Sequence, residues 1–260
     1  MTAAPRILAL EGVENFRDYG GYAAADGRFM PSGQFWRSAH HGQATEADLA
    51  AIGGLGLGTV VDLRRPLERD AQPTPRPPGF SAEVIDNDFG DRAEAPHVAF
   101  LRETDLSPDS VRAFFLNYYA NAPFEPRHGE LFRRYFEALA ERDGAVLIHC
   151  TAGKDRTGLL AALTHHVLGV HPDDAIADYL LTNQAARLEA RAPMVAQALE
   201  QSMGRTPSDV AVRAFLGVEA DYLRAALDAI AERCGSVDAY LESLGVDARR
   251  AEALRERHLV

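Results

Sequence analysis

One stretch of 16 residues, AVLIHCTAGKDRTGLL at 145–160, constrains this chain of 260 residues more than any other. Its four apolar residues at 145–148 predict a short buried strand, and a helix-periodic apolar run begins at Leu159. Between them lie Cys150 and a loop of small residues around Gly153. The N–H groups of such a loop and of the first helical turn have no intrahelical partners. A strand that turns through this loop into a helix therefore forms a cradle for an anion.

The side chains around this cradle predict covalent phosphate chemistry. A thiol at the base of an anion cradle is favoured as thiolate, because the helix end and nearby cations stabilise its negative charge. Arg156, six residues after Cys150, can reach back and offer its planar guanidinium to two oxygens of a tetrahedral anion. We therefore expect Cys150 to cleave phosphate esters through a cysteinyl-phosphate intermediate. The expected phosphate-binding residues are Thr151, Ala152, Gly153, Lys154, Arg156 and Thr157. The Thr157 hydroxyl would assist the departing sulfur in the second step.

Two other interpretations of this stretch fit less well. Free cysteine is often buried in cores, but a core turn has no need of Lys154, Asp155 and Arg156 together. A Walker-type nucleotide loop requires Ser or Thr after Gly-Lys, and here Asp155 follows Lys154.

The string HCTAGKDRTG resembles the signature of the cysteine-dependent protein tyrosine phosphatase superfamily. Its GKDRTG form is similar to that of bacterial tyrosine phosphatases that also act on phosphoserine, phosphothreonine or phosphoinositides. A second resemblance lies at 15–22, NFRDYGGY, close to the NFRDLGG segment of that family, with Tyr19 in place of the usual Leu. Further similarities at 61–64, at 178–180 and in the C-terminal part extend the resemblance over nearly the whole chain.

The resemblance implies a phosphoric monoester hydrolase of the protein tyrosine phosphatase type that needs no cofactor. Its substrate would be a phosphorylated protein or phospholipid. The alternatives are the same chemistry on phosphoinositides or phosphoserine and phosphothreonine, or a phosphate-binding pseudophosphatase without turnover.

A carboxylic acid must protonate the leaving oxygen in this chemistry. The bacterial relatives carry an aspartate in the signature where it is implicated in catalysis, which makes Asp155 the first candidate. The other candidates lie in an acidic loop after a predicted strand: Asp86, Asp88 and Asp91. Lys154 would add positive potential or bind an additional phosphate; alternatively it pairs with an acidic neighbour.

The expected fold is α/β, with a central, mostly parallel sheet and helices on both sides, in a single domain over 1–260. The predicted strands include 35–38, 59–63, 82–85 and 145–148. The reactive loop then lies at the carboxyl end of a strand, where open α/β sheets place their ligands. Residues 93–143 form a helical insertion, either a lid with Tyr118 and Tyr119 in an aromatic pocket or, as we favour, ordinary core helices. Residues 172–260 form a helical C-terminal part.

Several charged residues are assigned supporting roles. His149 is expected to hydrogen-bond to backbone groups and so hold the cradle. Asp62 and Arg64, at a strand exit, are expected to pair and order the adjacent loops. For Arg17 and Arg37 we favour a buried ion pair over contact with substrate.

Composition narrows the choice of partners and compartment. The net charge of −11 opposes binding to nucleic acid and to anionic membranes. Two cysteines, Cys150 and Cys234, do not form a disulfide framework, and a reducing compartment suits a free thiolate. Adjacent His165 and His166 lack metal-ligand spacing, so no metal is expected. Without a signal peptide or a span long enough for stable membrane insertion, the sequence predicts a cytoplasmic protein.

Overall fold

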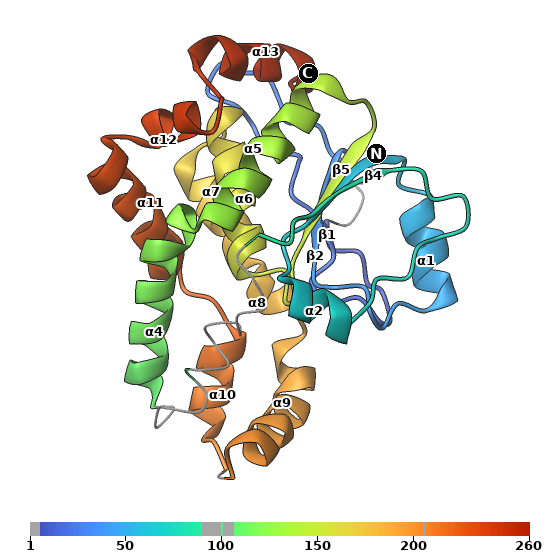
Figure 1. Cartoon of the computed structure of the whole chain (residues 1–260), viewed down its shortest axis with the longest axis vertical. Coiled ribbons are helices and arrows are strands. Elements are labelled where there is room, and N and C mark those ends of the chain that lie inside the picture. Colours follow the sequence, from blue (N-terminus) through green and yellow to red (C-terminus); the bar gives the residue numbers. More distant parts are fainter. Residues whose placement is uncertain (1–5, 90–99, 101–106, 205) are drawn as a thin grey trace.

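The computed structural model describes residues 6–89, 100, 107–204 and 206–260. A five-stranded sheet with the order β1-β2-β5-β3-β4 lies at its centre (Figure 1). The strands are β1 Arg17–Asp18, β2 Phe35–Ser38, β3 Leu57–Asp62, β4 Glu83–Ile85 and β5 Ala145–His149. Four of them run parallel, and β1 pairs antiparallel with β2 at the edge. The predicted α/β class with a mostly parallel sheet is confirmed.

Helices make up most of the rest of the chain. They are α1 Glu46–Gly53, α2 Pro66–Ala71, α4 Pro108–Asn121, α5 Pro126–Glu141, α6 Asp155–Val167, α7 Pro172–Leu180, α8 Thr182–Ala185, α9 Leu188–Met203, α10 Asp209–Leu216, α11 Ala220–Cys234, α12 Val237–Ser243 and α13 Ala248–His258, with a 3₁₀ turn η1 at Ala122–Phe124. Side chains cap several of them, as Thr45 does for α1 and Ser107 for α4. None of the described helices is both long enough and apolar enough to cross a membrane.

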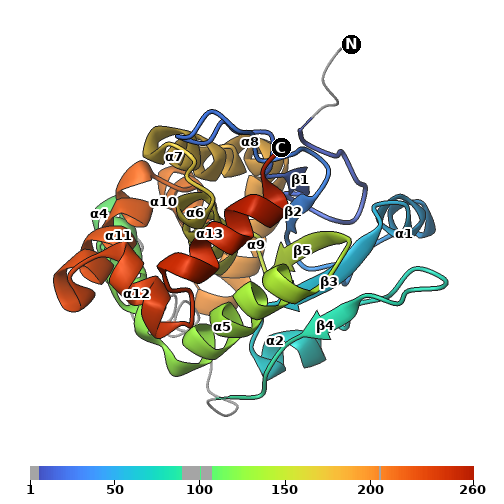
Figure 2. The same ribbon diagram turned by 90° about the horizontal axis from the view of Figure 1, so that it is seen from above.

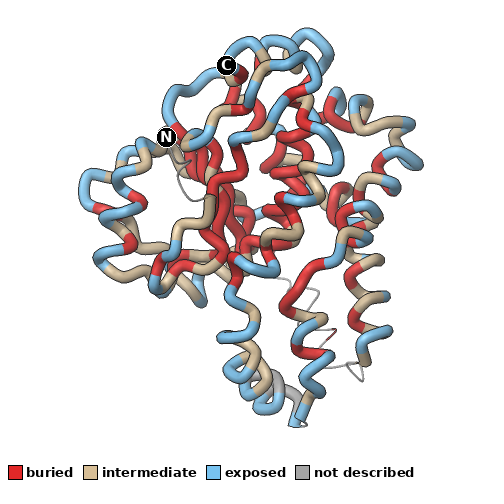
Figure 3. Tube along the Cα trace, turned by 180° about the vertical axis from the view of Figure 1, so that it is seen from behind, coloured by how far each residue is buried: buried red, intermediate tan, exposed pale blue. Residues whose placement is uncertain are grey.

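The helices cover the two faces of the sheet unequally (Figure 2). Successive strand residues point to opposite faces, so strands that are apolar throughout need cover on both sides. Val60 and Leu147 face a small cluster that includes Ile52 of α1. Val61 and Ile148 face the main core beneath the large helical layer. The buried part of the chain, red in Figure 3, follows the sheet and the helices next to it.

A buried ionic cluster ties the N-terminal strands to the C-terminal helices. Asp178 of α7 lies 2.7 Å from Arg37 of β2 and 3.6 Å from Arg17 of β1. Burial alone would raise the pKa of Asp178, but the two guanidinium groups outweigh it and lower the pKa. Arg17 and Arg37 are fully buried, which confirms their predicted place in a buried ion pair.

Two helices were not predicted individually. Helix α2 follows the strand exit at Arg64, with Pro66 at its start. Helix α10, which Ser208 caps, lies within the part of the chain predicted to be helical, but its bounds were not predicted. Both helices contribute side chains to the site.

Candidate active site

The loop that follows β5, residues 150–154, is held in place by hydrogen bonds to its carbonyl groups. Asn15 Nδ2 donates to the carbonyl oxygens of Ala152 (3.1 Å) and Gly153 (2.8 Å). Arg37 donates a further hydrogen bond to the Gly153 carbonyl at 3.1 Å. The N-terminal segment and β2 therefore fix the position of this loop on one side.

The opposite side of the loop presents its N–H groups. In a planar trans peptide the carbonyl and the next N–H point in opposite directions, so bonding the carbonyls behind the loop turns the N–H groups forward. The Thr151 carbonyl is also engaged, by the backbone N–H of His40 at 3.2 Å. Within the part of the chain that the structure describes, no group accepts a hydrogen bond from the N–H groups of residues 151–154. This arrangement of donors is the geometry expected of an anion cradle.

Gly153 allows this close seating. Its φ is +66°, in the left-handed region, and a Cβ at this position would lie 2.4 Å from the carbonyl atoms of Ser38. A side chain is excluded both by the backbone conformation and by the neighbouring strand.

Arg156, in the first turn of α6, is clamped by a carboxylate from α2. Its Nη1 lies 2.6 Å from Glu68 Oε2 and its Nη2 lies 2.7 Å from Glu68 Oε1, a bidentate pair. The same guanidinium also donates to the Leu63 carbonyl (3.1 Å) and to Thr151 Oγ1 (3.3 Å). The side chain therefore turns back toward the loop, as the sequence predicted, and its direction is fixed.

Glu68 is a site residue that the sequence analysis missed. Burial by itself would raise its pKa, but the charge and hydrogen bonds of Arg156 outweigh burial and hold the pKa of Glu68 well below its usual range. The reciprocal effect raises the pKa of Arg156 against its burial. The available signal was local: Pro66 followed by Glu68 is a typical helix start, with the carboxylate at N3 bonded to the N–H of Arg65.

Asp155 is held by a chain of buried tyrosine hydroxyls. Tyr119 of α4 donates to Asp155 Oδ1 at 2.9 Å and lies 2.7 Å from the hydroxyl of Tyr179 on α7. Lys154 Nζ is 3.9 Å from the same carboxylate oxygen. The carboxylate thus has a fixed orientation beside the loop.

Lys154 points away from the cradle, into the helical layer. Its Nζ donates to the carbonyls of Phe215 (2.6 Å) and Gly217 (3.1 Å) at the end of α10, and lies 4.2 Å from the ring centroid of Phe115. Burial lowers the pKa of Lys154, and the Asp155 charge offsets part of this. The expected pairing with an acidic neighbour is present, but the main role of this ammonium is to fix the end of α10.

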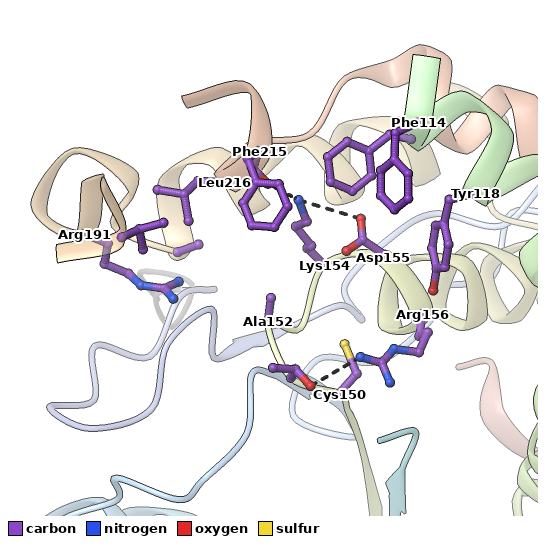
Figure 4. A pocket seen from close by; sticks show the side chains of 14 residues that line it. Phe114, Tyr118, Cys150, Ala152, Lys154, Asp155, Arg156, Arg191, Phe215 and Leu216 are labelled. Atoms are coloured by element: carbon purple, nitrogen blue, oxygen red, sulfur yellow. Dashed lines mark hydrogen bonds and ion pairs between the residues drawn. The ribbon is translucent and has the colours of Figure 1, made fainter. Parts of the chain in front are cut away.

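A cavity of about 200 Å³ opens above the loop (Figure 4). Helices α4, α6, α9 and α10 and the loop after β5 surround it. Its lining comprises Phe114, Phe115, Tyr118, Cys150, Thr151, Ala152, Lys154, Asp155, Arg156, Ala186, Arg191, Val195, Phe215 and Leu216. The lining combines a buried thiol, three cations, one carboxylate and several aromatic rings. It supplies the local positive charge that a chain of net charge −11 requires for an anionic ligand.

A family model described as "Tyrosine phosphatase family" matches residues 8–260. The chain belongs to the tyrosine phosphatase family. This confirms the resemblance seen in the signature, and with it the expected class of enzyme, a hydrolase of the protein tyrosine phosphatase type.

Three relatives support the assignment to this family. The "Putative tyrosine-protein phosphatase H16_A0669" of Cupriavidus necator is 36% identical over 244 residues, covering 92% of this chain and 85% of that protein. The "Tyrosine-protein phosphatase" of Nostoc commune is 29% identical, with 88% and 75% covered. The "Triple specificity protein phosphatase PtpB" of Mycobacterium tuberculosis is 31% identical, with 96% and 98% covered.

The described part of the acidic loop expected to offer rival general acids, up to Phe89, does not line the cavity of this tyrosine phosphatase. Asp88 pairs with Arg69 of α2, and Asp86 lies 4.0 Å from the same guanidinium. Both carboxylates lie outside the cavity lining, whereas Asp155 belongs to it. Asp91 lies outside the described residues.

The predicted supporting roles had different outcomes for the Asp62–Arg64 pair and for His149. Asp62 and Arg64 form the predicted pair, with 2.6 Å between Oδ2 and Nη2. The prediction for His149 was wrong: neither ring nitrogen has a hydrogen-bond partner among the described residues. Its ring instead stacks on His41 with centroids 5.1 Å apart, and the nearest carboxylate, Asp62, is 3.8 Å away. Burial lowers the pKa of His149 to about 4, so the ring is neutral at pH 7.

Two further predictions concern side chains around the cradle, and a third concerns metal binding. Tyr118 lines the cavity, but Tyr119 does not and packs in the core behind it, where it reaches Asp155. The buried hydroxyl of Thr157 has no hydrogen-bond partner among the described residues, the Cys150 thiol included. No three His, Cys, Asp or Glu side chains of the described chain gather in a metal-binding arrangement.

Proposed function

We propose that this chain hydrolyses phosphate monoesters with Cys150 as nucleophile and a phosphocysteine intermediate. One observation carries the proposal: the carbonyl groups of the loop after Cys150 are bonded on one side, its N–H groups have no acceptor among the described residues, and Arg156 is held beside them. The three N–H groups that follow the bonded carbonyls, those of residues 152–154, and a planar guanidinium match the oxygens of a phosphoryl group. The thiol lies at the base of this arrangement, where a nucleophile has to be.

In the first step the Cys150 sulfur attacks phosphorus and the phosphorus–oxygen bond to the leaving group breaks. The loop N–H groups and Arg156 bind the non-reacting oxygens as their charge develops. Asp155 gives its proton to the leaving oxygen, since its carboxyl group lines the same cavity and is oriented by Tyr119.

In the second step a water molecule attacks phosphorus and the phosphorus–sulfur bond breaks. The Asp155 carboxylate accepts the proton that this water loses, which restores its starting state. The sulfur leaves as thiolate, and a rotation of the unpartnered Thr157 hydroxyl toward it would stabilise the departing charge. Inorganic phosphate is the product.

Phosphotyrosine is the substrate that this cavity favours. The phenyl ring of a bound phosphotyrosine would pass between aromatic side chains, among them Phe114, Tyr118 and Phe215, before its phosphate reaches the loop. The names of the Cupriavidus and Nostoc relatives support this choice. The printed name of the Mycobacterium relative gives a reason to test phosphoserine, phosphothreonine and phosphoinositides beside it. Lys154 is not proposed as a site for an additional phosphate, because its ammonium group is already bonded to two carbonyls.

The test is hydrolysis of p-nitrophenyl phosphate in the presence of dithiothreitol and a chelator. The variants are Cys150→Ser and Asp155→Asn, and Cys234→Ser is the matched control because it removes the chain's other cysteine, at the end of α11. We expect Cys150→Ser to lose at least about 10³-fold in kcat and Asp155→Asn to lose about 10²-fold. The control should keep wild-type rates.

The outcomes separate the mechanisms clearly. Full activity in Cys150→Ser would disprove the thiolate mechanism. An Asp155→Asn variant with wild-type kcat would move the general acid to another residue. Vanadate binding without turnover by the wild type would identify a phosphate-binding pseudophosphatase instead.

A further inference from the structure

The cavity wall opposite Arg156 carries another arginine, Arg191, on α9. Arg191 and Val195 are four residues apart on this helix, so both face the cavity. Figure 4 shows the Arg191 guanidinium and the Arg156 guanidinium on opposite sides of Cys150. The site therefore holds a second guanidinium, apart from the one that the phosphoryl group would use.

Arg191 differs from the other two cations of the lining in its bonding. The guanidinium of Arg156 is paired with Glu68, and the ammonium of Lys154 is bonded to the carbonyls of Phe215 and Gly217. The Arg191 guanidinium has no hydrogen bond or ion pair with any described residue. Its side chain is half-buried rather than extended into solvent.

The charge of Arg191 acts inside the cavity. Burial is the main cause of the lowered pKa of Lys154, and the positive charge of Arg191 lowers it further. A half-buried guanidinium that has no counter-ion among the described residues, at the mouth of a phosphate cavity, is a ready partner for a second anionic group on the same ligand.

We propose that Arg191 determines specificity by binding the carboxylate of an acidic residue next to the phosphotyrosine of a peptide substrate. This inference rests on the proposed function, because it assumes that the phosphate lies on the loop after β5. The bound carboxylate would meet the planar guanidinium in bidentate geometry at the rim of the cavity.

Two features favour a peptide over a phosphoinositide in a membrane. The net charge of −11 repels an anionic bilayer, which presents many charges at once, more strongly than it repels one acidic peptide. The aromatic lining also suits a phenyl ring better than a polyhydroxylated inositol ring. Without a local cation, the negative charge of the whole chain would make acidic peptides poorer substrates. A preference for acidic peptides would therefore indicate a contact with a cation at the site.

The experiment compares kcat/KM on phosphotyrosine peptides that differ only in the two flanking residues: Glu, Gln or Lys. For the wild type we expect a Glu-to-Gln ratio of roughly 3 to 10, typical of one partly exposed charge pair. In Arg191→Gln the ratio should fall to about one or below. In Arg191→Glu the order should reverse, with the Lys peptide preferred over the Glu peptide.

Arg133→Gln is the matched control. Arg133 lies on α5, pairs with Glu137 on the same helix and does not line the cavity, so this change removes one positive charge elsewhere. It should keep the wild-type Glu-to-Gln ratio, which separates a local contact from an effect of net charge.

A wild-type ratio of about one, or a ratio that Arg191→Gln leaves unchanged, would overturn the inference. It would also be overturned if Arg191→Gln reduced hydrolysis of phosphatidylinositol bisphosphate in phosphatidylcholine vesicles but not the peptide ratio. Failure of the proposed function is recognised separately, by p-nitrophenyl phosphate turnover that does not depend on Cys150. In that case the affinities of the same peptides for Cys150→Ser, measured by fluorescence anisotropy, give the Glu-to-Gln ratio without turnover.

Discussion

At the scale of single residues, the orientation of Arg156 depends on Glu68. Glu68→Gln keeps the shape of the side chain but removes the charge that makes the bidentate pair strong. We expect kcat/KM for p-nitrophenyl phosphate to fall roughly 10- to 100-fold, which corresponds to about 1.4 to 2.7 kcal/mol of transition-state stabilisation. Steady-state kinetics measure this loss, and a value within twofold of wild type would show that Arg156 orients itself without Glu68.

The Glu68 pair should also be visible in the pH dependence of stability. The pKa of Glu68 in the folded chain lies below its value of about 4.3 in the unfolded chain. The pair therefore contributes its full stability above that pH and loses it as the pH falls toward the folded pKa. The difference in unfolding free energy between wild type and Glu68→Gln should shrink from pH 6 to pH 3 in urea titrations. A constant difference over this range would contradict the assignment.

Tyr119 is predicted to act as a positioning residue for Asp155. A general acid matters most when the leaving group is poor, so Tyr119→Phe should lower kcat for phenyl phosphate about 3- to 10-fold more than for p-nitrophenyl phosphate. Tyr240→Phe is the control, because its buried hydroxyl donates instead to the Pro123 carbonyl. Equal losses on both substrates would indicate a purely structural role for Tyr119.

At the scale of elements, the β5–loop–α6 unit depends on contact between Gly153 and the end of β2. Gly153→Ala places a Cβ against the Ser38 backbone and in the left-handed region, so we expect a loss of at least about 2 kcal/mol in unfolding free energy. Vanadate binding should be lost with it. Gly27→Ala is the matched control: Gly27 also has a positive φ (+88°), but its Cβ would meet nothing within 4 Å.

Thermal denaturation and vanadate titration of the two glycine variants distinguish two costs. Both variants carry the strain of a positive φ, but only Gly153→Ala adds a steric clash with the Ser38 backbone. A Gly153→Ala variant as stable as Gly27→Ala would show that β2 can move aside to accept the methyl group. The loop would then be less tightly seated than the hydrogen bonds from Asn15 and Arg37 indicate.

How well the role of a site residue could be predicted depends on how far apart the residue and its partners lie in the sequence. That Cys150 and Arg156 line one cavity could be predicted, because the strand, the loop and the helix N-terminus that carry them are adjacent in the chain. Glu68 was missed because its role comes from a contact across 88 residues, although its helix start was visible. The bonding of Lys154 to the end of α10 was missed for the same reason, since its carbonyl partners lie more than 60 residues away.

At the scale of the whole molecule, the sheet could be predicted and the cavity walls could not. The apolar strands predicted a buried parallel sheet, because each needs cover on both faces. The cavity is closed by α9 and α10, which lie in the part of the chain predicted to be helical, but the sequence does not indicate which surface they face. For this reason Arg191 did not stand out in the sequence as a site residue.

Buried histidines predict that the fold as a whole is sensitive to acid. Burial lowers the pKa of His128 to about 3 and that of His149 to about 4, below the value of about 6.5 for an exposed histidine. The unfolded chain therefore binds protons first, so stability is full above about pH 6.5 and falls as the pH falls toward 4. Each such histidine contributes up to about 1.4 kcal/mol per pH unit to this slope. His128→Gln should reduce the slope, measured by urea unfolding between pH 7 and 4.5, by that amount. An unchanged slope would mean that His128 is protonated in the folded chain.

The Asp178 cluster bears on where this polypeptide can be divided. A fragment that stops before α7 would keep the sheet and the reactive loop but leave the guanidinium groups of Arg17 and Arg37 without their carboxylate. Arg37 also holds the Gly153 carbonyl, so the same cut would disturb the loop itself. Anyone who trims the gene to a minimal catalytic unit, or exchanges the C-terminal helices between relatives, has to carry Asp178 along with the N-terminal strands.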